Sequence, residues 1–156
     1  MSVIISILSI LTIFFWYPYS FTVENSYFEN FAGFNIGKGK DYGNGGVDAN
    51  AIIQNNTFYK CGGLSGWAGT AYWYDAVVSC WVSYGSHVIV KNNNFIETVK
   101  YALAIDSDNS YIDAQYNYFG TSDESEIEKM IYDGDDDYDI PNTIDYSNYY
   151  TSKIEF

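Results

Sequence analysis

The chain has no arginine and little of the side-chain chemistry that nucleic-acid-binding and catalytic sites use. All seven of its basic residues are lysines, against 20 acidic residues, and the formal net charge is −13. Phosphate binding requires clustered Lys or Arg, so this composition argues against a nucleic-acid partner. His87 is the only histidine, and a lone histidine just before a strand is more often a turn or surface residue than a catalyst.

Cysteine is also scarce, with only Cys61 and Cys80. No second cysteine pair or histidine accompanies them, so their spacing is not that of a zinc site, and we expect no metal and no cofactor. Two interpretations remain open for the pair. They form one disulfide that closes a loop of about 20 residues and contributes about 3 kcal/mol in an oxidising exterior, or they are two buried thiols.

The chain has one long apolar run, from Val3 to Trp16. Fourteen residues of helix span about 21 Å, which is less than the roughly 30 Å of bilayer hydrocarbon. No lysine precedes the run, and no small-residue cleavage site follows it. Residues 1–20 are therefore expected to be either a signal-like or anchor-like segment or an opening coil of the fold, and residues 21–156 a single domain.

What the chain does contain is a fourfold repeat, at intervals of 30, 37 and 24 positions. Each unit begins with apolar residues at its first and third positions, the period-two pattern of a strand with one buried face. An Asn-containing corner and then a Phe follow. Repeats at such intervals predict a stacked solenoid. The four units are Phe21–Phe28, Ala51–Phe58, Val88–Phe95 and Ile112–Phe119.

The corner and the Phe have a physical interpretation. Asparagine tolerates the left-handed backbone region, and side-chain amides stacked at about 4.8 Å can form a hydrogen-bonded ladder. The Phe rings are expected to turn inward and stack in the core. The expected ladder residues are Asn25, Asn55, Asn56, Asn92, Asn93 and Asn117, and the expected stacked rings are Phe28, Phe58, Phe95 and Phe119.

This combination resembles the right-handed parallel β-helix, the architecture of the pectin-lyase-like superfamily and of many cell-surface proteins. Residues 114–121, Ala-Gln-Tyr-Asn-Tyr-Phe-Gly-Thr, look like the A-x-N-N-x-W-G-T closing coil of adhesin-like members, with Phe119 where Trp is usual. The resemblance implies an all-β solenoid of about four coils. It also implies that an acidic helix, an aspartate-rich turn and a final strand follow the closing coil.

The helix can be argued from the residues alone, at about 122–132. Thr121 and Glu124 have capping-box spacing, Ile127 and Met130 begin an apolar face that Ile131 extends, and Gly134 supplies a stop. A helix there would cover the open end of the stack, where apolar core and strand edges are otherwise exposed. Residues 106–139 hold twelve acids against one lysine, so the acidity belongs to this end.

The unequal intervals indicate insertions, and loops on a rigid scaffold are where function usually lies. Residues 62–84 are rich in aromatic side chains, which can stack on sugar faces. The alternative is an insertion that buries its own rings. The candidate ligand-binding residues are Trp67, Tyr72, Trp73 and Tyr74.

The resemblance implies two classes of function. Pectate-lyase-type members are thought to use an arginine base, which this chain lacks, so we expect a non-enzymatic, adhesin-like module, secreted or at the cell surface. Its expected partner is a polysaccharide or surface glycan, with membrane or cell-wall attachment through the N-terminus or flanking sequence. The rival is a polysaccharide lyase or hydrolase with Asp106 and Asp108 as acids and Lys91 or Lys100 as base. A purely structural stalk is the third alternative.

Two further motifs have both a functional and a bland interpretation. Closely spaced carboxylates from Asp133 to Asp139 suit calcium, but their spacing is not that of an EF-hand, which favours a solvated turn. Asn55-Asn56-Thr57 matches a glycosylation acceptor. A ladder position should face the neighbouring coils, however, which argues against modification.

Overall fold

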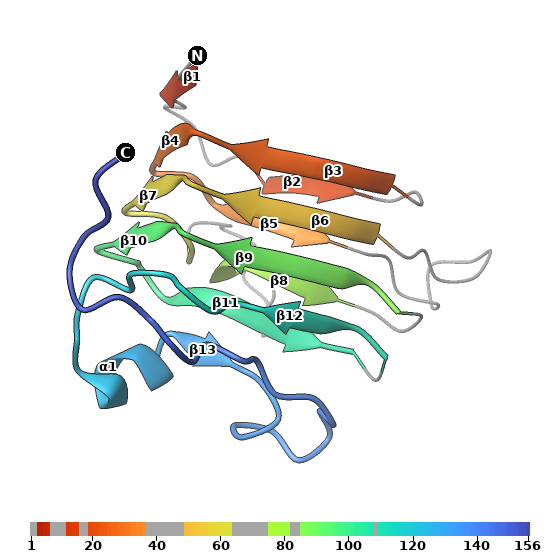
Figure 1. Ribbon diagram of the computed structural model, residues 1–156. Coiled ribbons are helices and arrows are strands. Elements are labelled where there is room, and N and C mark those ends of the chain that lie inside the picture. The colour runs from red at the N-terminus through yellow and green to blue at the C-terminus, as the bar shows by residue number, and fades with distance from the viewer. Residues whose placement is uncertain are drawn as a thin grey trace.

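The computed structural model describes residues 3–6, 12–15, 19–36, 49–63, 75–81, 85–107 and 109–156. These residues are mostly β-strand, arranged in three parallel sheets with one short helix near the C-terminus (Figure 1). The expectation of a mostly β chain with parallel strands and a C-terminal helix is confirmed at this level. The aromatic candidates at positions 67 and 72–74 lie outside the described residues, as does Asp108.

We name the sheets A, B and C. Sheet A contains β1 (Val3–Ser6), β4 (Ser26–Glu29), β7 (Thr57–Tyr59) and β10 (Asn94–Ile96). Sheet B contains β2 (Thr12–Phe15), β5 (Gly33–Ile36), β8 (Ala76–Trp81), β11 (Tyr101–Asp106) and β13 (Ile131–Tyr132). Sheet C contains β3 (Tyr19–Glu24), β6 (Ala49–Gln54), β9 (His87–Lys91) and β12 (Tyr111–Asp113).

The chain visits the sheets in the order A, B, C, and then begins again. We call one such visit a layer: β1, β2 and β3 form the first, and each strand pairs in parallel with its counterpart in the next layer. Figure 1 shows the layers stacked, with the N-terminal strands at one end and α1 at the other. After β12, the chain continues the pattern through the bridge Asn94–Tyr118, strand β13 and the bridge Asp113–Asp145. Whether residues 1–20 also act as a signal or anchor stays a prediction.

The four repeated Phe residues form a column behind sheet A. Their side chains are 0–3% exposed, and successive ring centroids lie 5.0, 5.3 and 5.4 Å apart with interplanar angles of 13°, 15° and 9°. The spacing follows from register, since Phe28 pairs with Phe58 and Phe58 with Phe95. Phe31 and Phe34 pack on the first ring of the column, at 5.2 and 5.5 Å from Phe28. The column therefore belongs to the hydrophobic core.

The two Asn positions of the repeat have different structural roles. The first is a left-handed turn between sheets C and A: Asn25, Asn55 and Asn92 have φ of 52°, 56° and 53°, and Tyr116 takes this conformation in the next layer with φ of 61°. Asparagine is among the residues that best tolerate this region. Backbone bonds link the turns, because Asn55 N–H donates to the carbonyl of Lys91 at 3.3 Å.

The second Asn position is a buried side-chain ladder. Asn93 Oδ1 accepts from the backbone N–H and from Nδ2 of Asn56, both at 3.0 Å, and Asn117 Oδ1 accepts from the same groups of Asn93 at 2.9 and 3.0 Å. Ser26 occupies the corresponding place in the preceding layer and donates its N–H to Asn56 Oδ1 at 3.0 Å. Each amide also donates to a carbonyl one layer back; the three acceptors are Val23, Ile53 and Val90.

A second left-handed turn, between sheets A and B, has no common residue type. Asn30, Lys60 and Glu97 have φ of 52°, 53° and 50°. Backbone bonds join these layers, with Asn30 N–H donating to the carbonyl of Tyr59 at 3.1 Å and Lys60 N–H to that of Ile96 at 3.0 Å. The stacking of the backbone, rather than side-chain preference, holds this column.

In sheet B, β5, residues 76–80 of β8 and the interior of β11 are buried on both faces. Phe34 and Leu103 belong to the core cluster, whereas Asn35, Ser79 and Ala104 lie in register at the alternate positions and are 1%, 0% and 0% exposed. The side chain of Asn35 has no hydrogen-bond partner among the residues that the structure describes. Burial on both faces is characteristic of parallel sheets and removes the alternating sequence pattern.

The helix α1 spans Glu124–Glu128 and is shorter than the expected 122–132. Its N-cap is Asp123, whose carboxylate accepts from the N–H of Ser125 at 3.0 Å, so the capping box of Thr121 and Glu124 was the wrong choice. Ile127 is buried, but Ile131 pairs with Leu103 in β13 and is not on the helix. Gly134 is not the helix stop, because the helix already ends at its C-cap Lys129.

Cys61 and Cys80 are both buried and are not joined in a disulfide, so the disulfide interpretation is corrected in favour of two buried thiols. Gly63, two residues beyond Cys61, donates its N–H to the carbonyl of Asp75 at 2.7 Å, just before β8. Cys80 lies five residues further along this extended segment, which is about 16 Å from Asp75. A disulfide requires Cα atoms within about 7 Å, so the strand holds the two thiols apart.

The C-terminal segment returns along the outside of sheet A (Figure 1). The side-chain amide of Asn94 donates to the carbonyl of Ile154 at 2.9 Å and accepts from its N–H at 2.8 Å. Tyr150 N–H donates to the carbonyl of Asn117 at 2.8 Å. The two bonds of Asn94 join residues 60 positions apart, and together the three bonds fasten the end of the chain to the stack.

Candidate functional site

The outer face of sheet C is the candidate binding surface of the described residues. Its strands present alternate side chains outward, and the pairing register aligns these side chains in rows across the sheet. One row is Ser20, Asn50, His87 and Tyr111, and the next is Thr22, Ile52, Ile89 and Asp113. Each row therefore runs perpendicular to the strands and takes one side chain from every layer.

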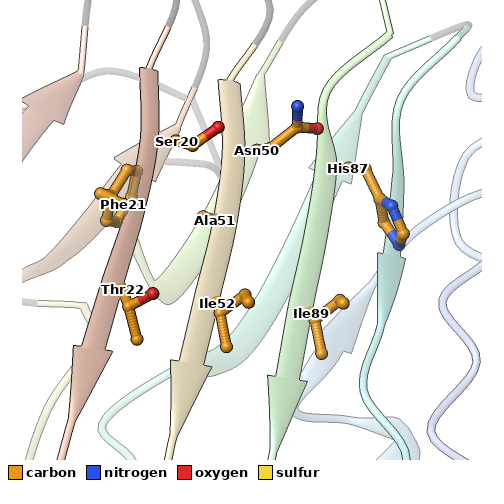
Figure 2. A pocket seen from close by; sticks show the side chains of 8 residues that line it. All are labelled: Ser20, Phe21, Thr22, Asn50, Ala51, Ile52, His87 and Ile89. Atoms are coloured by element: carbon orange, nitrogen blue, oxygen red, sulfur yellow. The ribbon is translucent and has the colours of Figure 1, made fainter.

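A shallow groove of 340 Å³ lies over these rows. Figure 2 shows the hydroxyls of Ser20 and Thr22, the amide of Asn50 and the ring of His87 on this face, with Ile52 and Ile89 next to Thr22 in the second row. The lining combines neutral hydrogen-bonding groups with aliphatic surface and includes no Asp, Glu or Lys. Such a lining suits a neutral polyhydroxylated ligand better than an ionic one.

An aromatic pair closes one side of the groove. The rings of His87 and Tyr111 stack with centroids 4.0 Å apart and planes inclined at 27°, and the Tyr111 hydroxyl lies 3.2 Å from His87 Nδ1. Tyr111 is 49% exposed, which leaves part of its ring available to a ligand. An exposed ring beside hydroxyl and amide groups provides an apolar face and polar partners together.

The far end of the same face carries charge. Glu24 Oε2 accepts from Gln54 Nε2 at 2.9 Å, and Lys91 lies in register with Gln54. In the last layer, Gln115 Nε2 donates to Asp145 Oδ2 at 2.9 Å. The two glutamines thus donate hydrogen bonds to carboxylates of the adjacent layers, and these bonds hold the side chains at this end of the face in place.

Of the residues of the enzymatic rival, the structure describes Asp106, Lys91 and Lys100 and places these three apart. Asp106 ends β11 in sheet B, whereas Lys91 belongs to sheet C. Lys100 precedes the other end of β11, about 20 Å along the chain from Asp106. Lys100 forms an ion pair with Asp75, and this hydrogen bond raises the pKa of its amine. A raised pKa is the opposite of what a catalytic lysine base requires.

The aspartate turn uses its carboxylates for its own backbone. Asp133 is buried and accepts from the N–H groups of Ile144 and Asp135 at 2.7 and 2.9 Å, and burial raises the pKa of its carboxyl group. Asp137 accepts from Asp139 N–H at 3.0 Å. Within the described residues, no group of three His, Cys, Asp or Glu side chains has a metal-site arrangement.

A second hollow, of 520 Å³, lies beside α1. It is bordered by Lys100 and Lys129, and both amines already have carboxylate partners. Lys129 Nζ lies 2.6 Å from Glu126 Oε1. Because both lysines are paired with carboxylates, neither amine is available to bind a charged ligand in this hollow.

The comparisons with known proteins name no relative: no family model, no curated protein and no solved structure matches the chain. No helix in the described part of the chain is long and apolar enough to cross a membrane. Function must therefore be argued from the surface itself.

Sequence reasoning placed His87 near a strand and gave it no role, and it missed Tyr111. The signal was present one residue before each repeat, where Ser20, Asn50, His87 and Tyr111 precede the first apolar residue. Extending the aligned units by this one position predicts the row that borders the groove. The candidates Trp67, Tyr72, Trp73 and Tyr74 stay predictions.

Proposed function

We propose that the chain is a right-handed parallel β-helix module that binds an extended, neutral carbohydrate on the outer face of sheet C. In this proposal it is non-enzymatic, adhesin-like and located outside the cell or on its surface. The fold proposal is supported by the repeated visits to sheets A, B and C and by the continuous Asn and Phe columns.

The observation that carries the binding proposal is the exposed His87–Tyr111 stack at the side of a groove lined by hydroxyl and amide groups. Adjacent layers lie about 4.8 Å apart. An extended polymer that runs across the strands therefore meets an equivalent row position at each layer. Ring stacking and neutral hydrogen bonds are both available along that line.

The groove gives less support to catalysis. General acid–base chemistry needs two groups placed on either side of a scissile bond. The groove lining contains one titratable side chain, His87, and no carboxylate. The proposal is therefore a binding module, and the aromatic insertion at positions 67–74 is a second contact region within the same proposal.

A glycan array with the full chain tests this proposal. We expect binding to one class of neutral extended glycan, and we expect Tyr111→Ala to weaken it about five- to thirtyfold, since loss of one stacked ring costs about 1–2 kcal/mol. Tyr138→Ala is the matched control, because Tyr138 is fully exposed in the turn after β13 and outside the groove. Trp73→Ala distinguishes the insertion from the groove.

No binding to any glycan would overturn the proposal and leave a structural stalk. Binding that is unchanged in Tyr111→Ala but lost in Trp73→Ala would move the site to the insertion. Release of reducing ends or unsaturated uronates from a polysaccharide would overturn the non-enzymatic part.

A further inference from the structure

The sequence contains one Asn-x-Ser/Thr motif, Asn55-Asn56-Thr57. The structure separates its two asparagines. Asn56 is 0% exposed and its amide donates to Val23 and Asn93 within the ladder. Asn55 occupies the left-handed turn one residue earlier, at the outer corner between β6 and β7. The sequence predicted that both asparagines belong to the ladder, but only Asn56 does, and the motif's acceptor position, Asn55, lies in the turn.

We propose that Asn55 is an acceptor for an N-linked oligosaccharide in the folded protein. The side chain of Asn55 is partly exposed, and none of the hydrogen bonds in the described part of the chain uses its amide, although its backbone N–H donates to Lys91. Glycosylation requires a side-chain amide that can reach the active site of the transferase. The Asn55 amide at the turn meets this requirement, because the ladder and the core fix the neighbouring residues and do not use this side chain.

The third residue of the motif is also suitably placed. Thr57 is half-buried at the start of β7, and its hydroxyl has only one long contact among the described residues, 3.4 Å from Asn94 Nδ2. The equivalent turns of two other layers can be compared with that of Asn55. Asn25 and Asn92 have the same turn conformation as Asn55 but are followed two residues later by Tyr27 and Asn94. The proposal therefore concerns Asn55 and excludes its structural equivalents.

The donor is a lipid-linked oligosaccharide of the polyprenyl phosphate or pyrophosphate class. Transfer forms a bond between Asn55 Nδ2 and C1 of the first sugar and breaks the bond between C1 and the carrier's phosphate oxygen. The phosphate leaves with the electron pair, and the amide proton passes to a base of the transferase. No oxidant or reductant is needed.

The glycan would not obstruct the groove. Asn50 and Ile52 border the groove, and Asn55 lies about 10 to 16 Å further along the chain. Glycosylation in the cell rests on the proposed surface location, because the donor and the transferase act on exported chains. Acceptor competence can be measured independently of that location and of glycan binding.

The test uses the full, folded chain with a purified single-subunit oligosaccharyltransferase that recognises Asn-x-Thr and with its lipid-linked donor. We expect a mass gain of one glycan, located by peptide mapping to Asn55. Asn55→Gln and Thr57→Val are expected to reduce it to background. Asn92→Gln makes the same substitution at an equivalent left-handed turn, and it is expected to leave the modification of Asn55 unchanged.

A synthetic peptide covering residues 52–59 shows that the transferase accepts the local sequence. If this peptide is modified while the folded wild type is not, the proposal is overturned. Modification at Asn56 instead of Asn55 would also overturn it. Because wild type alone decides these outcomes, a variant that fails to fold does not affect them, and failure of the glycan array leaves them unchanged.

Discussion

The side-chain oxygen of Asn93 accepts two hydrogen bonds from Asn56, one from its backbone N–H and one from its amide, both at 3.0 Å. Asn93 also donates to the carbonyls of Ile53 and Lys91, at 2.9 and 3.0 Å. A single buried side chain thus satisfies polar groups in two adjacent layers. Removing it would leave those groups buried without partners, which is the costly case for hydrogen bonds.

We therefore expect Asn93→Ala to lower the free energy of unfolding by about 3 kcal/mol or more, as measured by urea denaturation. Asn50→Ala, at an exposed position of sheet C, is the control and should change it by less than about 0.5 kcal/mol. Equal stability of the two variants would contradict the role given to the ladder.

The cysteines should behave as two shielded thiols. Burial raises the pKa of Cys61 to about 11, from 9.0 for a free thiol, so its thiolate fraction at neutral pH falls about 100-fold. Native protein should react slowly with a thiol reagent, and urea-unfolded protein should titrate two thiols rapidly. Cys80→Ala leaves Cys61 as a single probe.

A reducing agent should not change the melting temperature. An intact mass lower by two hydrogens, together with a melting temperature that falls on reduction, would show a disulfide and contradict the separate placement of Cys61 and Cys80.

The cap at the C-terminal end should carry a specific pH dependence. Burial raises the pKa of Asp133, so the folded protein holds this proton more tightly than the unfolded chain does. The stability that Asp133 contributes is present below its unfolded pKa of about 3.9 and is lost as the pH rises through its folded pKa.

As the pH rises from about 3 to 7, wild type should therefore lose unfolding free energy relative to Asp133→Asn. Asn142→Ala is the control, because it removes neutral hydrogen bonds to Ser107 and Ser110 from the same cap. Its difference from wild type should not depend on this titration. A shift in favour of wild type for Asp133→Asn would contradict the prediction.

The sequence predicted the parts of the fold in which one residue type repeats. Asn and Phe recur because the left-handed turn, the buried amide and the stacked ring each favour one side chain. Phe occurs in all four units, whereas Tyr116 replaces Asn at one turn and Ser26 replaces it at the start of the ladder. Sheet B could not be predicted in the same way. Both faces of β5 and of residues 76–80 of β8 are buried, so Asn35 and Ser79 take places where an alternating pattern expects exposure.

The second turn escaped prediction for a related reason. Lys60 and Glu97 share a left-handed conformation with Asn30 but no side-chain chemistry. The candidate site was missed because its row of side chains lies one position before the recognised repeat. The helix was overextended because Ile131 continues an apolar pattern that the structure uses in a strand paired with Leu103.

The ladder has a direction. At every step, the earlier layer supplies the N–H and the later layer supplies the accepting amide oxygen, from Ser26 to Asn56, then Asn93, then Asn117. A residue at the first place in this series needs only its backbone N–H, so a serine is sufficient there. A residue at the last place must bring an oxygen acceptor. The two ends of the column therefore differ in what they require: the first residue contributes only its backbone N–H, whereas the last must contribute a side-chain oxygen, which here is the amide oxygen of Asn117.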